Sequence, residues 1–330
     1  MRRVVRRVLL SLVVVVALGA AALLWGRLEF ERSGPLGEET TVVLPRGLGL
    51  DGITRRLGEA GIVARPWVFA LGVRLSGDAR DLRAGEYVFP AGISARGVLE
   101  LLLSGRTVMR RLTVPEGLTA AQVLELIAAA DGLVGEAEGT PDEGALLPET
   151  YYFSYGDTRA GMIARMEAAM QAALDSLWPA RAEGLPLATP REAAILASIV
   201  EKETALDHER AHIAGVFINR LRRGMHLQSD PTVVYALTGG KRALDRPLAR
   251  ADLDVDSPYN TYRNRGLPPT PIANPGRAAL AAVLNPLATE DLYFVADGSG
   301  GHVFARTLEE HNRNVARWRA LQAERGAQAE

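Results

Sequence analysis

The sequence predicts an α+β protein that consists of a single N-terminal transmembrane helix, a small α+β subdomain and a larger α+β domain. Three observations lead to this fold class. An apolar run lies close to the N-terminus; a motif of strand, Pro-x-Gly turn and amphipathic helix recurs; and helical patterns alternate with short strand candidates thereafter. With 330 residues, 48% of them hydrophobic, the chain is long enough for two or three domains with a buried core.

Residues 1–7 are predicted to be a cytoplasmic tail and residues 8–26 a transmembrane anchor. Residues 8–25 form an 18-residue run with a single polar member, long enough to cross the apolar core of a bilayer. Four arginines precede the run and favour a cytoplasmic N-terminus, which places the rest of the chain on the other side. A cleaved signal peptide that ends near residues 20–22 is the alternative, although the run exceeds the roughly 7–15 apolar residues usual in such a peptide.

Residues 27–40 are predicted to form a charged tether, and residues 41–106 the small subdomain. Its first motif is Pro45-Arg-Gly-Leu48, and the other two copies are Pro90-Ala-Gly-Ile93 and Pro115-Glu-Gly-Leu118. Strands are expected at 41–44, 86–89 and 111–114, just before these turns, and a further helix at 65–75. The order strand, helix, helix, strand over 41–89 resembles the LysM arrangement, which binds glycan chains. A plainer interpretation is that Pro-x-Gly commonly separates a strand from a helix.

Residues 107–330 are predicted to form the larger domain. The segment 224–275 is rich in turns and has few clear elements, which is typical of a binding surface. Thr189, Pro190 and Glu192 predict a helix that begins at Thr189 with a capping box. The other expected elements are a loop at 132–146, helices at 157–178 and 208–223, a hairpin from 292–296 and 303–305, and a charged helix from Leu308.

Glu203 is the candidate catalytic residue. At 100° per residue it lies about 40° from Ile199, within the apolar stripe of its helix, whereas Glu201 lies about 200° from Ile199, on the far face. Apolar surroundings should raise the pKa of Glu203, and a glutamate with a raised pKa can act as a general acid near neutral pH. A structural ion pair is the alternative role for this glutamate.

The segment His208-Glu-Arg-Ala-His212 matches the zinc peptidase pattern H-E-x-x-H. Both histidines fall opposite the apolar stripe, and Ile218 stands where one class of these enzymes has its third zinc ligand. A zinc peptidase that uses His208, Glu209 and His212 is therefore kept as an alternative. The polar composition of the segment favours the solvated start of a helix.

A group of amides, hydroxyls and aromatic rings follows the Glu203 helix. Such side chains suit a sugar, because its hydroxyls need directional hydrogen bonds and its ring faces stack on aromatic rings. The same residue types are also common in turns, so their composition fits ordinary loops as well. The group consists of Asn219, Arg220, Gln228, Ser229, Asp230, Tyr235, Tyr259, Asn260, Thr261 and Tyr262.

Seven sequence blocks give the chain a resemblance to the YceG-like family. The resemblance covers the anchor, the LysM-like unit and the larger domain, which is nearly the whole chain. The blocks are Ala197-Ser-Ile-Val-Glu-Lys-Glu-Thr204, Val216-Phe-Ile-Asn-Arg-Leu221, Leu227-Gln-Ser-Asp-Pro-Thr-Val233, Ser257-Pro-Tyr-Asn-Thr-Tyr262, Gly266-Leu-Pro-Pro269, Ile272-Ala-Asn-Pro-Gly276 and Leu292-Tyr-Phe-Val-Ala-Asp-Gly298.

The resemblance implies a bacterial inner-membrane enzyme whose catalytic domain lies in the periplasm. Such an enzyme cuts nascent peptidoglycan strands internally, between N-acetylmuramic acid and N-acetylglucosamine. Its partners would be glycan strands and peptidoglycan synthases (penicillin-binding proteins), and it would need no metal or cofactor. The family's catalytic glutamate corresponds to Glu203, and the substrate contacts are expected from Glu149, Asn219, Gln228, Ser229, Asp230, Tyr259 and Asn260.

One block departs from the family pattern, because Pro-Asp-Thr-Tyr appears here as Pro148-Glu-Thr-Tyr151. This departure bears on the contacts near Glu149 and not on the reaction.

The implied reaction explains why one carboxyl group can suffice. Ordinary glycosidases use two carboxyl groups. A lytic transglycosylase takes its nucleophile from the substrate, so Glu203 would first donate a proton and then accept one, leaving a 1,6-anhydro end. From a different class, a scaffold that binds glycan without cutting it is the alternative function.

The formal net charge of −1 gives no overall field that would attract nucleic acid, and no such partner is expected. The chain has no cysteine, which excludes disulfides, thiolate zinc sites and a lipid-modified cysteine.

Overall fold

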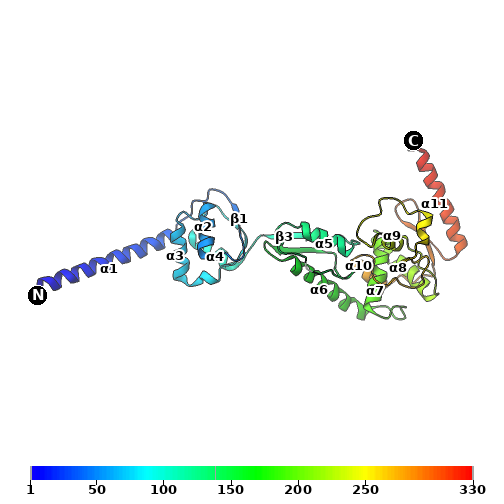
Figure 1. Ribbon diagram of the computed structural model, residues 1–330, viewed down its shortest axis with the longest axis horizontal. Helices are drawn as coiled ribbons and strands as arrows, with labels where there is room; N and C mark the ends of the chain where they lie inside the picture. The colour runs from blue at the N-terminus through cyan, green and yellow to red at the C-terminus, as the bar shows by residue number, and fades with distance from the viewer. Residues whose placement is uncertain (1, 138, 329–330) are drawn as a thin grey trace. The chain divides into compact units, whose positions relative to one another are not determined.

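The computed structural model describes residues 2–137 and 139–328 of the chain (Figure 1). The chain divides into two compact units. Unit 1 comprises the residues up to Arg111 together with Gly132–Val134 and Tyr152–Asp157. Unit 2 comprises Leu112–Asp131, Gly135–Tyr151 and the residues from Thr158 onward.

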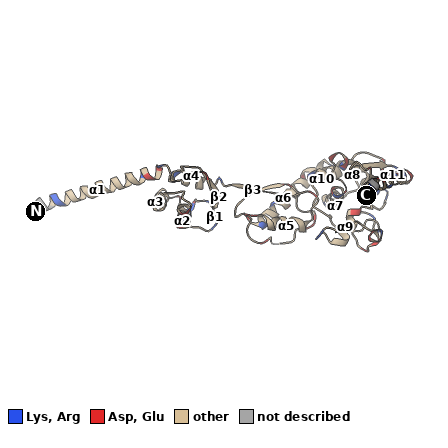
Figure 2. Cartoon of the chain, turned by 90° about the horizontal axis from the view of Figure 1, so that it is seen from above, with Lys and Arg blue, Asp and Glu red and all other residues tan. Residues whose placement is uncertain are grey.

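The N-terminal segment is one long helix, α1 (Arg2–Glu31), of 30 residues. Among the described residues it is the one helix that is long and apolar enough to cross a membrane, over Val5–Glu31, by length and composition. Figure 2 shows charged residues near its two ends and none along its middle. The predicted helix is confirmed, and it continues through residues 27–31, at the start of the predicted tether.

Unit 1 continues with a small sheet covered by helices. β1 pairs with β2 in an antiparallel register that sets Thr40 opposite Phe89 and Leu44 opposite Gly85. The predicted order of strand, helix, helix, strand is confirmed. The elements are β1 (Thr40–Leu44), α2 (Leu50–Glu59), α3 (Pro66–Ser76), a 3-10 turn η1 (Asp78–Arg80), β2 (Gly85–Phe89) and α4 (Ala95–Ser104). Their buried core includes Leu44, Leu57, Phe69, Tyr87, Phe89 and Leu102.

The three Pro-x-Gly turns share one backbone requirement. Gly47, Gly92 and Gly117 have φ angles of 85°, 67° and 76°, a region that only glycine enters at little cost. In each copy the glycine therefore lets the chain leave a strand and enter the turn before a helix.

The third copy of the motif follows α4 in the chain, and Met109–Arg111 of its strand still belong to unit 1. β3 (Met109–Thr113) leads to α5 (Ala120–Ala129) and pairs with β4 (Thr150–Ser154) in a two-stranded sheet. Thr119 caps α5, because its hydroxyl accepts a hydrogen bond from the backbone of Gln122 at 3.3 Å. α6 (Arg159–Leu177) and a short 3-10 turn η2 (Trp178–Ala180) follow, close to the predicted helix at 157–178.

The rest of unit 2 is a helical core with a hairpin beside it. α7, α8 and α10 pack together around buried residues such as Leu196, Ile213, Phe217 and Leu280. The predicted hairpin is confirmed as the antiparallel pair β5 and β6. The elements are α7 (Pro190–Glu203), α8 (Asp207–Arg222), α9 (Asp230–Thr238), a 3-10 turn η3 (Arg250–Asp254), α10 (Arg277–Leu284), β5 (Tyr293–Ala296), β6 (His302–Ala305) and α11 (Leu308–Gln328).

Two local predictions in unit 2 need correction. The segment 224–275 was expected to be turn-rich with few clear elements, but it contains the helix α9, which begins at Asp230-Pro231. Proline is tolerated in the first turn of a helix, where its missing N–H is not needed, so this dipeptide begins α9 instead. At α7 the Thr189 hydroxyl accepts from the Glu192 backbone as predicted, but the Glu192 carboxylate accepts from Ala188 N, not from the cap itself.

Candidate active site

Glu203 is the last residue of α7, at the edge of the buried helical core. Residues 193–200 of α7 are all buried, and Ile199 and Val200 are completely so. Glu203 itself is half-buried, whereas the adjacent Lys202 is exposed. The helix therefore carries one carboxyl group from the apolar core to the point where the core meets solvent.

Burial and its neighbours determine the protonation of Glu203. Burial raises the pKa of Glu203 to about 7, the negative charge of Asp230 adds to this effect, and the Ser229 hydroxyl, which donates a hydrogen bond to Oε1, works against it. His302 and Arg220 also lower the pKa through their charge. The predicted raised pKa is confirmed, and its main cause is desolvation, as expected.

Glu201 does not lie on a solvated face, although it points away from Glu203. Its side chain is only 4% exposed, and it pairs with Arg210 at 3.6 Å. It also accepts a hydrogen bond from Gly276 N at 2.9 Å. The helix is thus covered on both sides, because the start of α8 and the loop before α10 pack over the face opposite the apolar stripe. Burial, opposed by the Gly276 hydrogen bond, raises the pKa of Glu201 above its ordinary value.

The Ser229 hydroxyl is held in place by the loop around it. Ser229 is buried, and its backbone N–H donates to the Thr261 hydroxyl at 3.0 Å. That hydroxyl also lies 2.8 Å from the Thr232 hydroxyl. Gln228, just before, has a φ angle of 51°, which is uncommon for a residue other than glycine. A strained backbone beside Glu203 is the kind of feature that functional sites retain.

Arg220 anchors the opposite side of the site. Its guanidinium is buried and donates to the backbone oxygens of Leu292 and Leu227, each at 2.6 Å. It lies 5.3 Å from the centre of the Tyr293 ring. The side chain therefore ties α8 to the segments before α9 and β5 while it places a positive charge near Glu203.

A carboxylate–imidazole pair, formed by Glu209 and His302, lies close enough for the charge of His302 to act on Glu203. Glu209 Oε2 lies 2.7 Å from His302 Nδ1, and Oε1 accepts from His302 N at 2.7 Å. The Thr204 hydroxyl donates to the same carboxylate at 3.2 Å, which links the pair to the residue after Glu203. Burial acts to raise the pKa of Glu209, but these hydrogen bonds outweigh it and hold the pKa below its ordinary value.

Sequence reasoning missed His302 as part of the site. No motif marks His302 in the sequence. The one indirect signal is its partner Glu209, which lies in the H-E-x-x-H match and would activate the zinc-bound water in a zinc peptidase. The three residues of that match have different surroundings: His208 is exposed, Glu209 binds His302, and His212 Nε2 lies 2.8 Å from Asp291. Within residues 2–137 and 139–328, no three His, Asp or Glu side chains are grouped as metal ligands would be.

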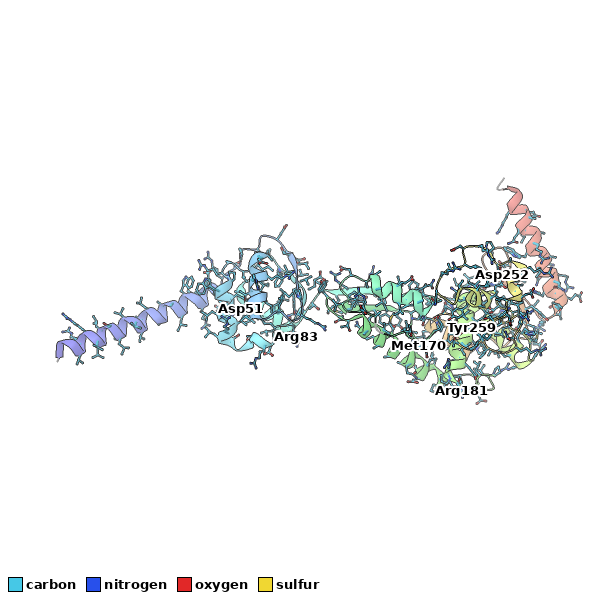
Figure 3. All side chains as sticks on the ribbon, viewed as in Figure 1. Asp51, Arg83, Met170, Arg181, Asp252 and Tyr259 are labelled. Carbon is cyan, nitrogen blue, oxygen red and sulfur yellow. The ribbon has the colours of Figure 1, made fainter. Side chains whose placement is uncertain are left out.

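Four of the expected substrate contacts are placed as follows. Asp230 is exposed and accepts from the Tyr262 hydroxyl at 2.6 Å, and Gln228 is exposed beside it. Tyr259, labelled in Figure 3, packs against Tyr235 with the ring centres 4.8 Å apart and the rings tilted by 50°, and it shares a hydrogen bond with Thr270. Glu149 is exposed before β4, and its charge acts on Tyr151 rather than on Glu203.

The two asparagines hold loops. Asn260 is completely buried, and its amide donates to the backbone oxygens of Leu253 and Val255 at 2.9 and 2.8 Å. The Asn219 amide donates to Thr289 O and Asp291 O at 2.8 and 3.1 Å. The donors of both side chains are therefore occupied by the protein, while Ser229 and Asp230 come together with Glu203.

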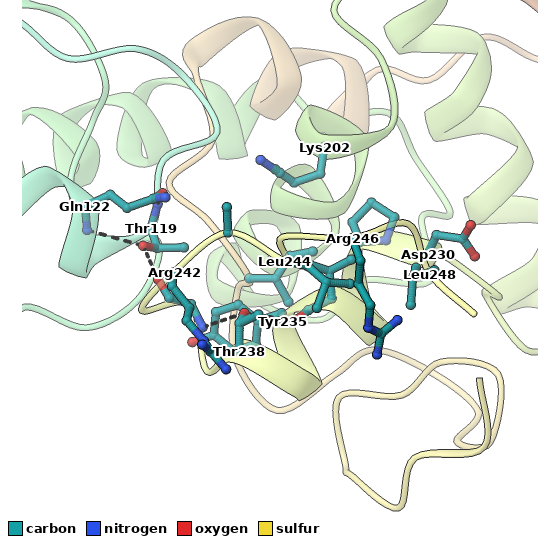
Figure 4. A pocket seen from close by; sticks show the side chains of 15 residues that line it. Thr119, Gln122, Lys202, Asp230, Tyr235, Thr238, Arg242, Leu244, Arg246 and Leu248 are labelled. Carbon is teal, nitrogen blue, oxygen red and sulfur yellow. Dashed lines mark hydrogen bonds between the residues drawn. The ribbon is translucent and has the colours of Figure 1, made fainter. Parts of the chain in front are cut away.

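A cavity of about 440 Å³ lies next to this site (Figure 4). We call it the α9 groove, because α9 forms one wall and the other wall comes from Gly240, Arg242, Ala243, Leu244, Arg246 and Leu248. Asp230 and Lys202, which respectively follow Ser229 and precede Glu203 in the chain, both line the groove, and Figure 4 shows Thr119 and Gln122 at the end opposite Asp230. Asp230 therefore belongs both to the groove and to the surroundings of Glu203.

Comparison with known proteins places the chain among related sequences. The model of the YceG-like family matches residues 42–317. An endolytic murein transglycosylase of Streptococcus pneumoniae R6 is 34% identical over 84% of this chain and 58% of its own length. One of Bacillus subtilis 168 is 33% identical over 82% of both proteins. The chain thus spans 58% of the length of the streptococcal relative.

A solved structure is also similar. The crystal structure of a yceG-like protein of Listeria monocytogenes has 30% sequence identity and a TM-score of 0.52, and the match covers 84% of this chain and 99% of that one. The likeness therefore extends across nearly all of that protein.

Proposed function

Because the chain belongs to the YceG-like family, we propose that it is an endolytic lytic transglycosylase that cuts peptidoglycan glycan strands with Glu203 as its catalytic residue. One observation carries this proposal: Glu203 is a half-buried carboxyl group with a pKa raised to about 7 by burial. At neutral pH a large fraction of such a group is protonated and able to act as a general acid.

The proposed reaction uses this carboxyl group twice. Protonated Glu203 donates its proton to the glycosidic oxygen that leaves the muramic C1 carbon. The carboxylate then accepts the proton of the muramic C6 hydroxyl, whose oxygen forms the new bond to C1. One C–O bond breaks, one forms, and the proton returns to Glu203, so no water is consumed. The products are a free hydroxyl end and a 1,6-anhydro end.

Neighbouring groups support both halves of this cycle. The Ser229 hydroxyl orients Oε1 by donating a hydrogen bond to it. Arg220 and His302 stabilise the ionised form through their charge, and Asp230 favours the protonated form. The acid and base forms of Glu203 are thereby kept close in free energy, as a residue that must alternate between them requires. We assign sugar contacts to Gln228, Ser229, Asp230 and Tyr259.

In the cell we place the protein in a bacterial inner membrane. α1 would be its single anchor, with the N-terminus in the cytoplasm and the active site in the periplasm. Peptidoglycan synthases are the proposed partners, because nascent strands emerge at that membrane. We propose unit 1 as a second glycan contact, in keeping with its LysM-like order of elements.

The test is a product analysis with full-length protein in detergent. Wild-type protein should release internal fragments with 1,6-anhydro ends, detected by mass spectrometry. Glu203→Gln should lose roughly 1,000-fold or more in rate, because it removes both proton-transfer steps. Glu125→Gln, an exposed glutamate on α5, should retain wild-type activity. Retained activity in Glu203→Gln would overturn the assignment.

Two other outcomes would indicate different functions. Reducing ends in place of anhydro ends would indicate hydrolysis with water as the nucleophile. Wild-type protein that binds strands without cutting them would indicate the glycan-binding scaffold.

A further inference from the structure

We propose that the α9 groove binds the peptide stem of the muramic acid residue whose glycosidic bond is cut. This inference rests on the proposed function and adds a substrate group to it. The stem would distinguish peptide-bearing strands from bare glycan.

The position of the groove fits a group attached to that sugar. Lys202 immediately precedes Glu203 in the chain, and Asp230 both lines the groove and acts through its charge on Glu203. The muramic residue presents C1 to the catalytic carboxyl and carries its peptide on the lactyl group at C3. A stem that leaves the sugar on the side of Asp230 would enter the groove that Asp230 lines.

The charges of the groove complement a peptide that carries carboxylates. Arg242 is exposed and forms no ion pair or hydrogen bond within the described part of the chain. Lys202 has only a backbone oxygen, Gly117 O at 3.2 Å, as its partner there. Arg246 differs, because Asp252 accepts from it at 2.6 and 2.8 Å. Figure 4 shows Lys202 and Arg242 on the lining. Two cations are thus available to a ligand carboxylate, with which they form strong hydrogen bonds.

The apolar lining favours a peptide over a further sugar. Pro231, Val234, Leu244 and Leu248 contribute side chains to the walls. A sugar carries hydroxyls around its ring and would leave these surfaces unmatched, whereas the alkyl side chains of a peptide bury against them. A volume of about 440 Å³ is in the range of sites that hold small ligands or short segments.

The experiment compares one glycan preparation with and without its stems. Full-length protein in detergent is given strands that carry peptides, or the same strands after an amidase has removed them, and kcat/KM is measured for each. Wild-type protein should prefer the peptide-bearing strands by about tenfold, the effect of one charge-assisted contact. Arg242→Gln should bring this ratio close to one, and Arg242→Lys should keep most of it.

The matched control is Lys241→Gln, which removes an exposed cation next to Arg242 in the chain but outside the groove lining. It should keep the wild-type ratio. A wild-type ratio of one overturns the inference and leaves the proposed function intact, because bare strands are then cut as well as peptide-bearing ones. A ratio that survives in Arg242→Gln also overturns it. Failure to cut either substrate overturns the inference together with the proposed function.

A separate observation on unit 1 points to a second surface. α3 exposes an apolar stripe at positions i, i+4 and i+8: Trp67, Leu71 and Leu75 are 57%, 47% and 70% exposed. The geometry assigns this stripe to the lipid interface of the membrane that α1 crosses. This second inference rests on the proposed anchoring by α1.

The stripe is continuous with the anchor. The Trp67 ring stacks on Trp25 near the end of α1, with ring centres 5.9 Å apart, and Arg65 lies 5.0 Å from the Trp25 ring. A cavity of about 820 Å³, lined by residues of α1, α3 and α4, runs between them. Tryptophan and arginine beside an apolar span are typical of the membrane–water boundary. A lipid tail is therefore the occupant that matches the cavity between α1, α3 and α4.

Single cysteines can test this contact, because the chain has none of its own. Leu71→Cys and Thr41→Cys, the latter exposed on β1, are labelled with a nitroxide in full-length protein in vesicles. The Leu71 label should be relaxed by oxygen, which concentrates in lipid, and the Thr41 label by a water-soluble nickel complex. Equal exposure of both labels to the nickel complex would overturn the inference. Protein that fails to enter vesicles at all would overturn the proposed anchoring and the contact with it.

Discussion

At Glu203, burial and two adjacent side chains act on the same proton in different directions. Burial favours the neutral acid, Asp230 favours it further, and Ser229 favours the anion by donating a hydrogen bond. Because Ser229 and Asp230 are neighbours in the chain, single substitutions can separate their effects. These two residues therefore offer a direct test of what determines the working pH.

The first prediction concerns the pH profile. In the proposed reaction only the acid form of Glu203 can donate the first proton, so activity should fall as the pH rises through about 7. Ser229→Ala removes a group that lowers the pKa and should move this fall to higher pH. Asp230→Asn removes a group that raises the pKa and should move it to lower pH, each by roughly half a pH unit or more. The measurement is kcat/KM on glycan strands from pH 5 to 9. If the profiles of Ser229→Ala and Asp230→Asn shifted in the same direction, the opposite effects assigned to the two side chains would be wrong.

The second prediction concerns stability and is independent of the proposed reaction. Folding raises the pKa of Glu203 from 4.5 to about 7. The protonated carboxyl group therefore favours the folded state fully at pH values below the unfolded-state pKa, and this stabilisation is lost as the pH rises through the folded-state pKa. Glu203→Gln should then be more stable than wild type at pH 8, by up to about 3 kcal/mol, with little difference at pH 4. Denaturant unfolding at both pH values measures this. A difference that does not depend on pH would show that the carboxyl group is well solvated.

At the scale of elements, turns and helix ends explain why most predictions succeeded. The strands, the motif helices and α7 arise from local signals: alternation, 3.6-residue periodicity and capping. α9 was missed because Asp230-Pro231 is compatible with both a turn and a helix start, and only the surrounding chain decides between them. Only one half of the capping box predicted at α7 forms, the hydrogen bond from Glu192 N to the Thr189 hydroxyl. The Glu192 carboxylate could accept from Ala188 N or from Thr189 N, and it accepts from Ala188 N.

The third prediction tests the Pro-x-Gly turn. Gly47 has a φ angle of 85° and open space where a Cβ would lie, so Gly47→Ala introduces backbone strain without a clash. It should destabilise the protein by about 1 kcal/mol. Gly37→Ala is the control, because that site is equally open and its φ is not positive. Unfolding by denaturant compares the two, and equal stabilities would contradict the role assigned to the glycine.

At the scale of the whole molecule, the proposed topology depends on α1. The four arginines before the apolar run favour a cytoplasmic N-terminus, and the proposed reaction requires the Glu203 site to lie on the opposite side, where the glycan strands would be. The single apolar helix among the described residues allows one crossing.

The fourth prediction tests this orientation with single cysteines. In spheroplasts, a membrane-impermeant maleimide should label Glu39→Cys, beyond the anchor, at once. Val5→Cys, before the anchor, should be labelled only after lysis. Labelling of Val5→Cys in intact spheroplasts would reverse the topology, and release of Glu39→Cys protein as a soluble, shortened chain would indicate a cleaved signal peptide.

The sequence by itself determined the apolar N-terminal helix, the strand and helix order of unit 1 and the side of α7 on which Glu203 lies. These features depend on residues close together in the chain, where the geometry of a helix or strand makes the pattern readable. Only the tertiary structure brought Ser229 to Glu203, paired Glu209 with His302, and buried Glu201 under Arg210. Those contacts join segments up to 93 residues apart, and no local periodicity specifies which distant segment packs over a given helix face.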